Sequence, residues 1–163
     1  MPEIVELLAS SVHRFVGRPA DGPEPAPADE LVDEIQVRAE LGIVGDRYFG
    51  KAAHRQASVT VIAAESLPPG TGLAQVRRNI LTTGITVDDL VGSVLVLDSG
   101  QGPVRLRMNR AAHPCAWMDV TIGPGAWRGL RGRGGVRCTP LTDGILRVGP
   151  VDVTIADEPE RRS

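Results

Sequence analysis

The chain has 163 residues, a formal net charge of −2 at pH 7, 42% hydrophobic and 23% charged residues. These values fit one globular domain with a real core and exclude a protein that is basic over a whole face, as a general nucleic-acid binder would be. No run of 18 apolar residues is present, so no membrane span is expected. The acidic start lacks the basic and apolar regions of a signal peptide, which predicts a cytoplasmic protein.

Glycine and proline number 19 and 13, which leaves little room for long helices and favours short strands joined by turns. In chain order, strands are predicted over 3–8, 31–38, 58–63, 77–83, 93–97, 104–108, 136–141, 145–148 and 151–155. One helical turn is expected at 64–67 and short helical pieces at 116–119 and 125–130, and the proline-rich stretch 18–29 predicts a surface loop. The pattern favours a single mainly β domain, a β-barrel or a strongly curved sheet with a few short helices.

Two segments present polar side chains in settings that suggest a ligand. In 41–50, three glycines bracket Asp46 and Arg47, so the backbone is expected to adopt special dihedral angles that orient these polar side chains toward a ligand. The alternative is a hairpin with an exposed ion pair of little energetic weight. Arg77 and Asn79 precede a strand, where a guanidinium fork and an amide can bind an anion such as a phosphate. The alternative there is a solvated strand end.

Cys115 is one of two cysteines, with His113 and Pro114 just before it and a predicted helical turn just after it. A nearby cation or a helix start favours the reactive thiolate, whereas the competing interpretation is a small buried hydrophobe. Cys138 lies in a plain strand and is expected to be structural. A disulfide between the two is not expected in a reducing cytosol, and two cysteines cannot complete a four-ligand zinc site.

The stretch after Cys115 alternates glycine with arginine. One interpretation is an anion cradle, and the others are a solvated turn or an RNA-binding segment, which the acidic net charge disfavours. Aromatic residues cluster as Trp117 and Trp127 near the cysteine and as Tyr48 and Phe49 in the Gly-Asp-Arg segment, with Phe15 elsewhere. This clustering indicates either a shared pocket or a satellite core.

Taken in order, four motifs resemble the MOSC domain, the module named after the C-terminal part of molybdenum-cofactor sulfurase and also found as stand-alone bacterial proteins. The resemblance covers about 31–153, and the opening Ser-x-x-His turn at 10–13 also fits. The motifs are Gly45-Asp46-Arg47-Tyr48, Arg77-Arg78-Asn79-Ile80, His113-Pro114-Cys115-Ala116-Trp117-Met118 and Arg133-Gly134-Gly135.

The resemblance implies a mainly β barrel that binds the molybdenum cofactor or handles sulfur for metal–sulfur centres. Cys115 would be a persulfide carrier or the thiolate ligand to molybdenum, a metal that suits a soft sulfur donor. Arg77 and Asn79 would hold the pterin and its phosphate. The residues expected in the surrounding pocket wall are Asp46, Arg47, His113 and Arg133.

The same resemblance shapes the expected partners. Pyridoxal phosphate belongs to the family through a separate desulfurase domain, and Lys51 is the only lysine here, in a predicted exposed turn. No covalent pyridoxal phosphate is therefore expected on this chain, and a persulfide would come from a partner such as a cysteine desulfurase. A redox partner would instead serve a small molybdenum-dependent reductase. Some relatives carry a second cysteine where this chain has Ala111 and Ala112, so an internal disulfide relay is excluded.

Two alternatives stay open beside these chemical roles. In one, the chain stores or escorts the pterin cofactor without chemistry, and Cys115 only anchors it. In the other, the chain has lost cofactor binding and acts as an interaction domain.

Overall fold

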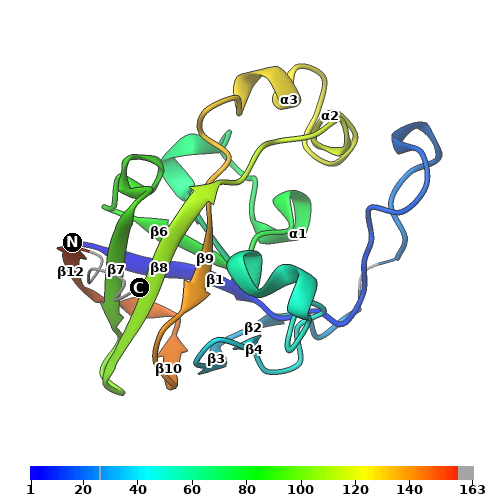
Figure 1. Ribbon diagram of the computed structural model, residues 1–163. Helices are drawn as coiled ribbons and strands as arrows, with labels where there is room; N and C mark the ends of the chain where they lie inside the picture. The colour runs from blue at the N-terminus through cyan, green and yellow to red at the C-terminus, as the bar shows by residue number, and fades with distance from the viewer. Residues whose placement is uncertain (26, 158–163) are drawn as a thin grey trace.

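The computed structural model describes residues 1–25 and 27–157 and is built mainly of short strands. Its larger sheet has nine strands, in the order β11-β1-β6-β5-β9-β8-β7-β12, and β2 also pairs with β1. Those strands are β1 (Glu3–Leu8), β2 (Leu31–Val32), β5 (Val59–Ala63), β6 (Ile80–Thr83), β7 (Ser93–Asp98), β8 (Pro103–Ala111), β9 (Val136–Pro140), β11 (Gly149–Pro150) and β12 (Asp152–Asp157). Figure 1 shows this sheet with two short helices, α2 (Trp117–Thr121) and α3 (Ala126–Gly129), beyond one end of β8.

A second sheet of three strands has the order β10-β3-β4. It consists of β3 (Glu34–Arg38), β4 (Gly42–Ile43) and β10 (Gly144–Arg147). The single strand predicted over 31–38 is in fact two, because β2 pairs with β1 in the large sheet while β3 pairs with β10 in the small one. The break falls at Asp33, where the chain passes from one sheet to the other.

Among the described strands only β5 and β6 pair in parallel, with Val61 opposite Ile80, and all other strand pairs are antiparallel. A parallel pair needs a crossover connection. Here the crossover carries a 3-10 turn, η3 (Ala64–Ser66), and one turn of helix, α1 (Leu73–Val76). This connection brings Arg77, Arg78 and Asn79 to the start of β6, in the middle of the sheet.

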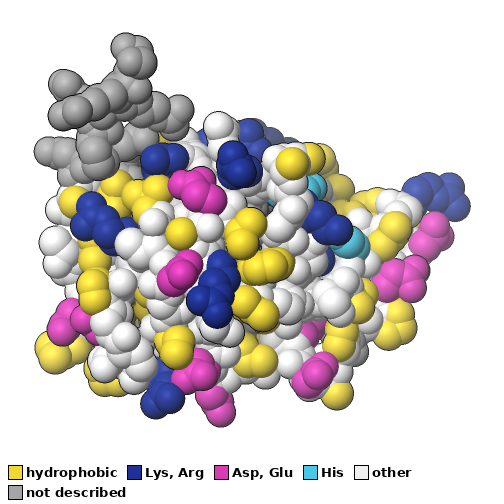
Figure 2. Space-filling view, turned by 60° about the horizontal axis from the view of Figure 1, so that its bottom comes forward, with side chains coloured by type: hydrophobic (Ala, Val, Ile, Leu, Met, Phe, Trp, Pro, Cys, Tyr) yellow, Lys and Arg dark blue, Asp and Glu magenta, His cyan; other side chains and the backbone are white. Residues whose placement is uncertain are grey.

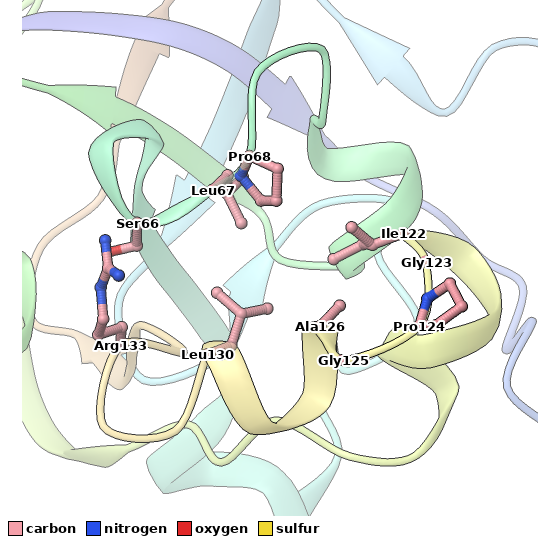
Figure 3. Close-up of a pocket in the computed structure, with 11 residues that line it drawn as sticks. Ser66, Leu67, Pro68, Ile122, Gly123, Pro124, Gly125, Ala126, Leu130 and Arg133 are labelled. Atoms are coloured by element: carbon pink, nitrogen blue, oxygen red, sulfur yellow. The ribbon is translucent and has the colours of Figure 1, made fainter.

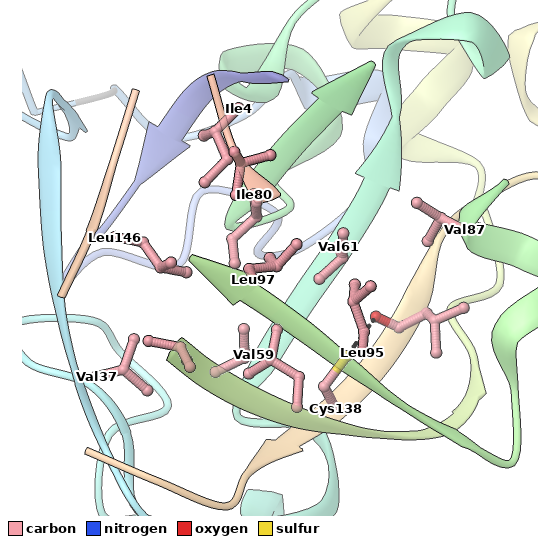
Figure 4. Close-up of a cluster of buried hydrophobic side chains, with 14 of the residues drawn as sticks. Ile4, Val37, Val59, Val61, Ile80, Val87, Leu95, Leu97, Cys138 and Leu146 are labelled. Carbon is pink, nitrogen blue, oxygen red and sulfur yellow. Dashed lines mark hydrogen bonds between the residues drawn. The ribbon is translucent and has the colours of Figure 1, made fainter. Parts of the chain in front are cut away.

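Side chains on the two faces of β5 belong to two different apolar cores. Val59 and Val61 join the main core with Leu95, Leu97 and others, and Figure 4 shows these side chains pointing toward one another between the strands. Ile62 faces the opposite way, into a second cluster that includes Leu73, Met118 and Leu130 from the helical segments. A strand that is buried on both faces has a nearly continuous run of apolar residues in its sequence, and this run is why β5 could be predicted so clearly.

The mainly β class with a few short helices is confirmed, whereas closure into a barrel is not found among the described residues. The hydrogen-bonded path runs from β11 to β12 without returning on itself, so the structure is a large mixed sheet with a smaller one beside it. The helical pieces after the cysteine are α2 (Trp117–Thr121) and α3 (Ala126–Gly129). The other short helices are η1 (Pro19–Asp21), η2 (Ala52–Ala57) and η4 (Val87–Leu90).

The segment that carries η1 projects from the body of the molecule on one side (Figure 1). On the face in Figure 2, basic, acidic and apolar side chains are interspersed over the surface instead of forming one large patch of a single charge. Within 1–25 and 27–157, none of the helices has the length and apolar character needed to cross a membrane.

Candidate functional site

Cys115 lies between the end of β8 and the start of α2, as the sequence predicts, and is partly exposed. Cys138 is fully buried in β9, with its sulfur 3.3 Å from Sδ of Met108, and burial raises the pKa of its thiol. Both cysteines are free, so there is no disulfide between them. Of the two thiols, only that of Cys115 is placed to meet a ligand or a partner.

The buried side chain of Arg78 ties the cysteine segment to the rest of the site. Its Nε donates to the carbonyl of Gly134 at 2.9 Å, and its terminal nitrogens donate to the carbonyls of Val76, Ala112 and His113 at 3.3, 3.5 and 3.4 Å. Three of the four motifs therefore meet at one guanidinium. Arg78 appears in the motif set, yet the sequence assigned it no role.

Charged and titratable groups surround Arg78. Burial and the positive charges of Arg137 and Arg47 together lower the pKa of Arg78 to about 10, whereas Cys115 and Tyr48 act in the opposite direction. The guanidinium is still protonated at neutral pH, because that value lies well above 7. A buried cation is thus fixed among backbone carbonyls close to the cysteine.

Two glycines allow the chain to pass this closely. A Cβ on Gly134 would overlap the carbonyl oxygen of Ala112, which Arg78 also contacts. Gly135 has φ +92° and would place a Cβ against the carbonyl oxygen of Val61. The Arg-Gly-Gly motif is therefore explained here by close backbone packing against the segment that leads to Cys115.

Asp46 and Asn79 form a buried network behind the site. The amide of Asn79 donates to Oδ1 of Asp46 at 3.2 Å and to the carbonyl of Leu8 at 3.1 Å, and its oxygen accepts from the N–H and hydroxyl of Thr60. Asp46 also accepts from the backbone N–H groups of Ser10 and Tyr48. Both polar groups of the Asn79 amide are thus used within the protein.

Arg47 and Arg77 are oriented by this network and by a second carboxylate. Arg47 contacts Oδ1 of Asp46 at 3.3 Å and donates to the carbonyl of Arg77. Arg77 pairs with the buried Glu30 at 2.5 Å and has φ 59°, a left-handed conformation that is rare for a residue other than glycine. Strain of this kind persists where the surroundings enforce it, and it clusters at functional sites.

The two arginines open onto a small cavity of about 90 Å³. Its lining residues are His13, Arg14, Phe15, Arg47, Tyr48 and Arg77. Arg14 is held at the rim by bonds to the carbonyls of Glu24 and Ala74, at 2.6 and 3.2 Å. Three guanidinium groups thus border one cavity, and guanidinium groups are the donors that phosphate and carboxylate groups prefer.

Aromatic contacts complete the cavity and connect it to the cysteine segment. The rings of Phe15 and Trp117 stack at 5.1 Å with an interplanar angle of 6°, and Trp117 comes two residues after Cys115. Tyr48 packs between His13 and His54, with ring centroids at 5.5 and 4.7 Å. Phe15, which seemed isolated in the sequence, therefore belongs to the site.

His13 stands in the cavity wall with its ring largely exposed. Partial desolvation lowers the pKa of His13 below its ordinary value of 6.5, and the positive charge of Arg47 adds to this effect. The neutral imidazole is therefore favoured at neutral pH. An anion bound between the guanidinium groups would reverse the sign of the local charge and favour the protonated ring.

Two of the predicted wall residues lie elsewhere. The His113 side chain is exposed, and only its backbone carbonyl contacts the site. Arg133 donates to the carbonyl of Glu65 at 3.0 Å and lines a different cavity. Within 1–25 and 27–157, no cluster of three or more His, Cys, Asp or Glu side chains is arranged to hold a metal ion.

The sequence missed His13, Arg14 and Phe15 as site residues, although the Ser-x-x-His turn was a weak signal for the first of them. No local pattern marks Arg14 or Phe15. They reach the cavity because β1 ends beside β6, which places the segment after Leu8 against Asn79.

Comparison with solved structures places this fold among known proteins. The YuaD protein from Bacillus subtilis is similar with a TM-score of 0.72 and 16% identity over 98% of each chain. YiiM from Geobacillus stearothermophilus has a TM-score of 0.62 and 15% identity, over 94% of this chain and 75% of its own. YiiM from Escherichia coli has a TM-score of 0.56 and 15% identity, over 94% of this chain and 70% of its own.

No protein-family model matches the chain, and no curated protein matches it in sequence. The structural likeness supports the MOSC-like fold that the motifs predict. At these identities it concerns the fold alone.

Proposed function

We propose that this chain is a MOSC protein that binds the molybdenum cofactor, with its phosphate in the arginine cavity and Cys115 as a thiolate ligand or persulfide carrier. The observation that carries the proposal is the junction at Arg78. One buried guanidinium joins the segment that supplies Arg77 to the segment that supplies Cys115. This contact supports a proposal that combines the arginine cavity and the reachable thiol of Cys115 in one region.

The residues present fit the anionic end of such a cofactor. A cavity of about 90 Å³ equals the share of about three water molecules in liquid water, the scale of a phosphate group and too small for a whole pterin. Arg14, Arg47 and Arg77 supply the donors that phosphate prefers. Glu30 pairs with Arg77 but is not among the residues that line the cavity.

Each side chain has a definable part in this proposal. Arg47 and Arg77 bind the anion, oriented by Asp46 and Glu30. Arg78 fixes the backbone before Cys115, and the stacked Phe15 and Trp117 shield the region between thiol and cavity from water. The cofactor, when bound, supplies a molybdenum centre whose soft character suits a thiolate ligand.

As a carrier, Cys115 takes sulfur from a partner. Its thiolate attacks the outer sulfur of a persulfide on the donor protein, the donor's S–S bond breaks, and the donor leaves as a thiolate while Cys115 becomes a persulfide. The donor is of the cysteine desulfurase class. This chain's own lysine, Lys51, is exposed in a turn and lies outside the cavity.

A cofactor escort without chemistry is the alternative, and the arrangement of the cavity makes it testable. Cys115 is not one of the residues that line the arginine cavity. Binding through the phosphate should therefore survive Cys115→Ser, whereas metal ligation or sulfur transfer should not.

The deciding experiment is elemental analysis and intact mass of protein purified anaerobically from a host that makes the cofactor. Stoichiometric molybdenum that is lost in Cys115→Ser identifies the metal ligand. A mass increase of about 32 Da that reductant removes and Cys115→Ser lacks identifies the carrier. Molybdenum retained in Cys115→Ser identifies the escort, and absence of both signals overturns the proposal.

A further inference from the structure

A second and larger cavity, of about 570 Å³, lies between the stretch after β5 and the α2–α3 segment (Figure 3). Its walls come from the stretch after β5, with Leu67 and Pro68, and from the α2–α3 segment, with Ile122, Ala126 and Leu130. It shares no lining residue with the arginine cavity. Its volume falls within the range of about 300–1,000 Å³ typical of small-molecule sites.

The walls are apolar because they are the outer surface of the second core cluster. Leu130 belongs to that cluster, and Leu67, Ile122 and Ala126 pack against it. In Figure 3 the side chains of Leu67, Ile122 and Leu130 point into the space between the two segments. An apolar molecule in this space would cover hydrophobic surface that now faces water.

One charged side chain stands at the end of this apolar cavity. Arg133 is fixed by its bond to the carbonyl of Glu65, and it lies beside Ser66 at the mouth. A guanidinium has five N–H donors, so this single bond leaves donors for a ligand. On the far side of Arg133 a neighbouring cavity contains Glu65, Asp88 and Asp89, whose carboxylates would repel an anion. A negative group on a ligand would therefore bind Arg133 from the side of the apolar cavity.

Glycines keep the cavity open. A Cβ on Gly123, Gly125 or Gly129 would meet no atom within 4 Å. Gly129 is the informative one, because it lies in α3 without a positive φ and has no conformational need to be glycine. A side chain added at this exposed position would therefore enter the open space beside the cavity wall.

We propose that this cavity binds a small amphiphilic anion, with an apolar body between Leu67 and Leu130 and one sulfonate, carboxylate or phosphate group on Arg133. The site is independent of the proposed cofactor function, because neither the arginine cavity nor Cys115 contributes to it.

The test uses the fluorescent probe 8-anilinonaphthalene-1-sulfonate, which has an apolar ring system and one sulfonate. The wild-type chain should bind one probe molecule saturably. Arg133→Gln should weaken binding about tenfold, which is the loss of one charge-assisted contact. Gly129→Leu should weaken binding, because it places a bulky side chain in the cavity wall, while Ala53→Leu on an exposed face of η2 should bind as the wild type does.

A neutral probe, N-phenyl-1-naphthylamine, separates charge from shape and protects the test against a misfolded variant. It should bind the wild type and Arg133→Gln equally and should bind Gly129→Leu more weakly, with far-ultraviolet circular dichroism verifying each fold. Cys115→Ser should bind both probes normally, whatever becomes of the cofactor proposal. Unsaturable probe binding to the wild type, or sulfonate binding unchanged in Arg133→Gln, would overturn the inference.

Discussion

The side-chain amide of Asn79 lies 3.2 Å from Oδ1 of Asp46 and joins the start of β6 to the turn after β4. Asp46 in turn holds the guanidinium of Arg47, which lines the arginine cavity. Asn79 is 1% exposed. Because both ends of this buried amide are bonded within the protein, Asn79 would, in the proposed function, position Arg47 through Asp46 instead of contacting the pterin.

Asn79→Ala should destabilise the protein by about 3 kcal/mol. The substitution leaves the N–H of Thr60 and the carbonyl of Leu8 without partners in a buried region, and each unsatisfied group costs about 1–3 kcal/mol. Urea denaturation followed by circular dichroism measures this loss. The matched control is Asn109→Ala, whose amide bonds Gln56 and Thr139 near the surface and should cost about 1 kcal/mol or less. Equal losses in the two variants would contradict a central role for Asn79.

The elements that the sequence predicted well are those whose pattern is local. The β-branched run of β5, the apolar run of β7 and the alternation in β8 identify strands without reference to any partner. Pro114 and the polar residues around it place Cys115 at a strand-to-helix junction for the same reason. Cys138, in a plain strand, is buried as expected.

What the sequence could not predict depends on contacts between distant segments. The division of 31–38 at Asp33 is set by two different partner strands, and no residue within the stretch encodes both. The stacking of Phe15 on Trp117 and the four carbonyl bonds of Arg78 likewise arise only after β1, β6 and β8 are aligned in the sheet. For Arg133 the motif predicted a position near the cysteine, but the side chain lines another cavity.

Glu30→Ala should cost about 3–5 kcal/mol, because it leaves the buried guanidinium of Arg77 without its carboxylate. Replacing both partners by methionine should recover part of that loss, since the pair then no longer has to be desolvated. The matched control is Glu34→Ala, which breaks a surface pair with Arg147 and should cost less than about 1 kcal/mol. Chemical denaturation of the four proteins provides the comparison. A Glu30→Ala variant as stable as Glu34→Ala would show that the pair is not buried in solution.

One thiol per chain should react with 5,5′-dithiobis(2-nitrobenzoic acid) in the native protein. Cys115 is partly exposed, while Cys138 is fully buried and its thiol pKa is raised by burial, which disfavours the reactive thiolate. Unfolding in guanidinium should release the second thiol. In native Cys115→Ser the fast reaction should be absent. A fast reaction that persists in this variant would mean that β9 opens readily enough to expose Cys138.

His13 should report the binding of an anion through its titration. Partial desolvation and Arg47 lower its pKa in the folded chain, so below pH 6.5 the unfolded chain binds more protons than the folded one. Stability from this group is therefore present above pH 6.5 and declines as pH falls through the pKa of His13 in the folded chain. The effect is small because the ring is largely exposed, and His13→Gln should remove it.

Phosphate held by Arg14, Arg47 and Arg77 should raise the pKa of His13, which can be measured by NMR of the imidazole C–H signals with and without phosphate. Arg47→Gln should raise the pKa of His13 in the phosphate-free protein and reduce its response to phosphate, because it removes a repelling charge and a ligand for the anion together. If phosphate leaves the His13 titration unchanged in the wild type, the cavity does not bind phosphate.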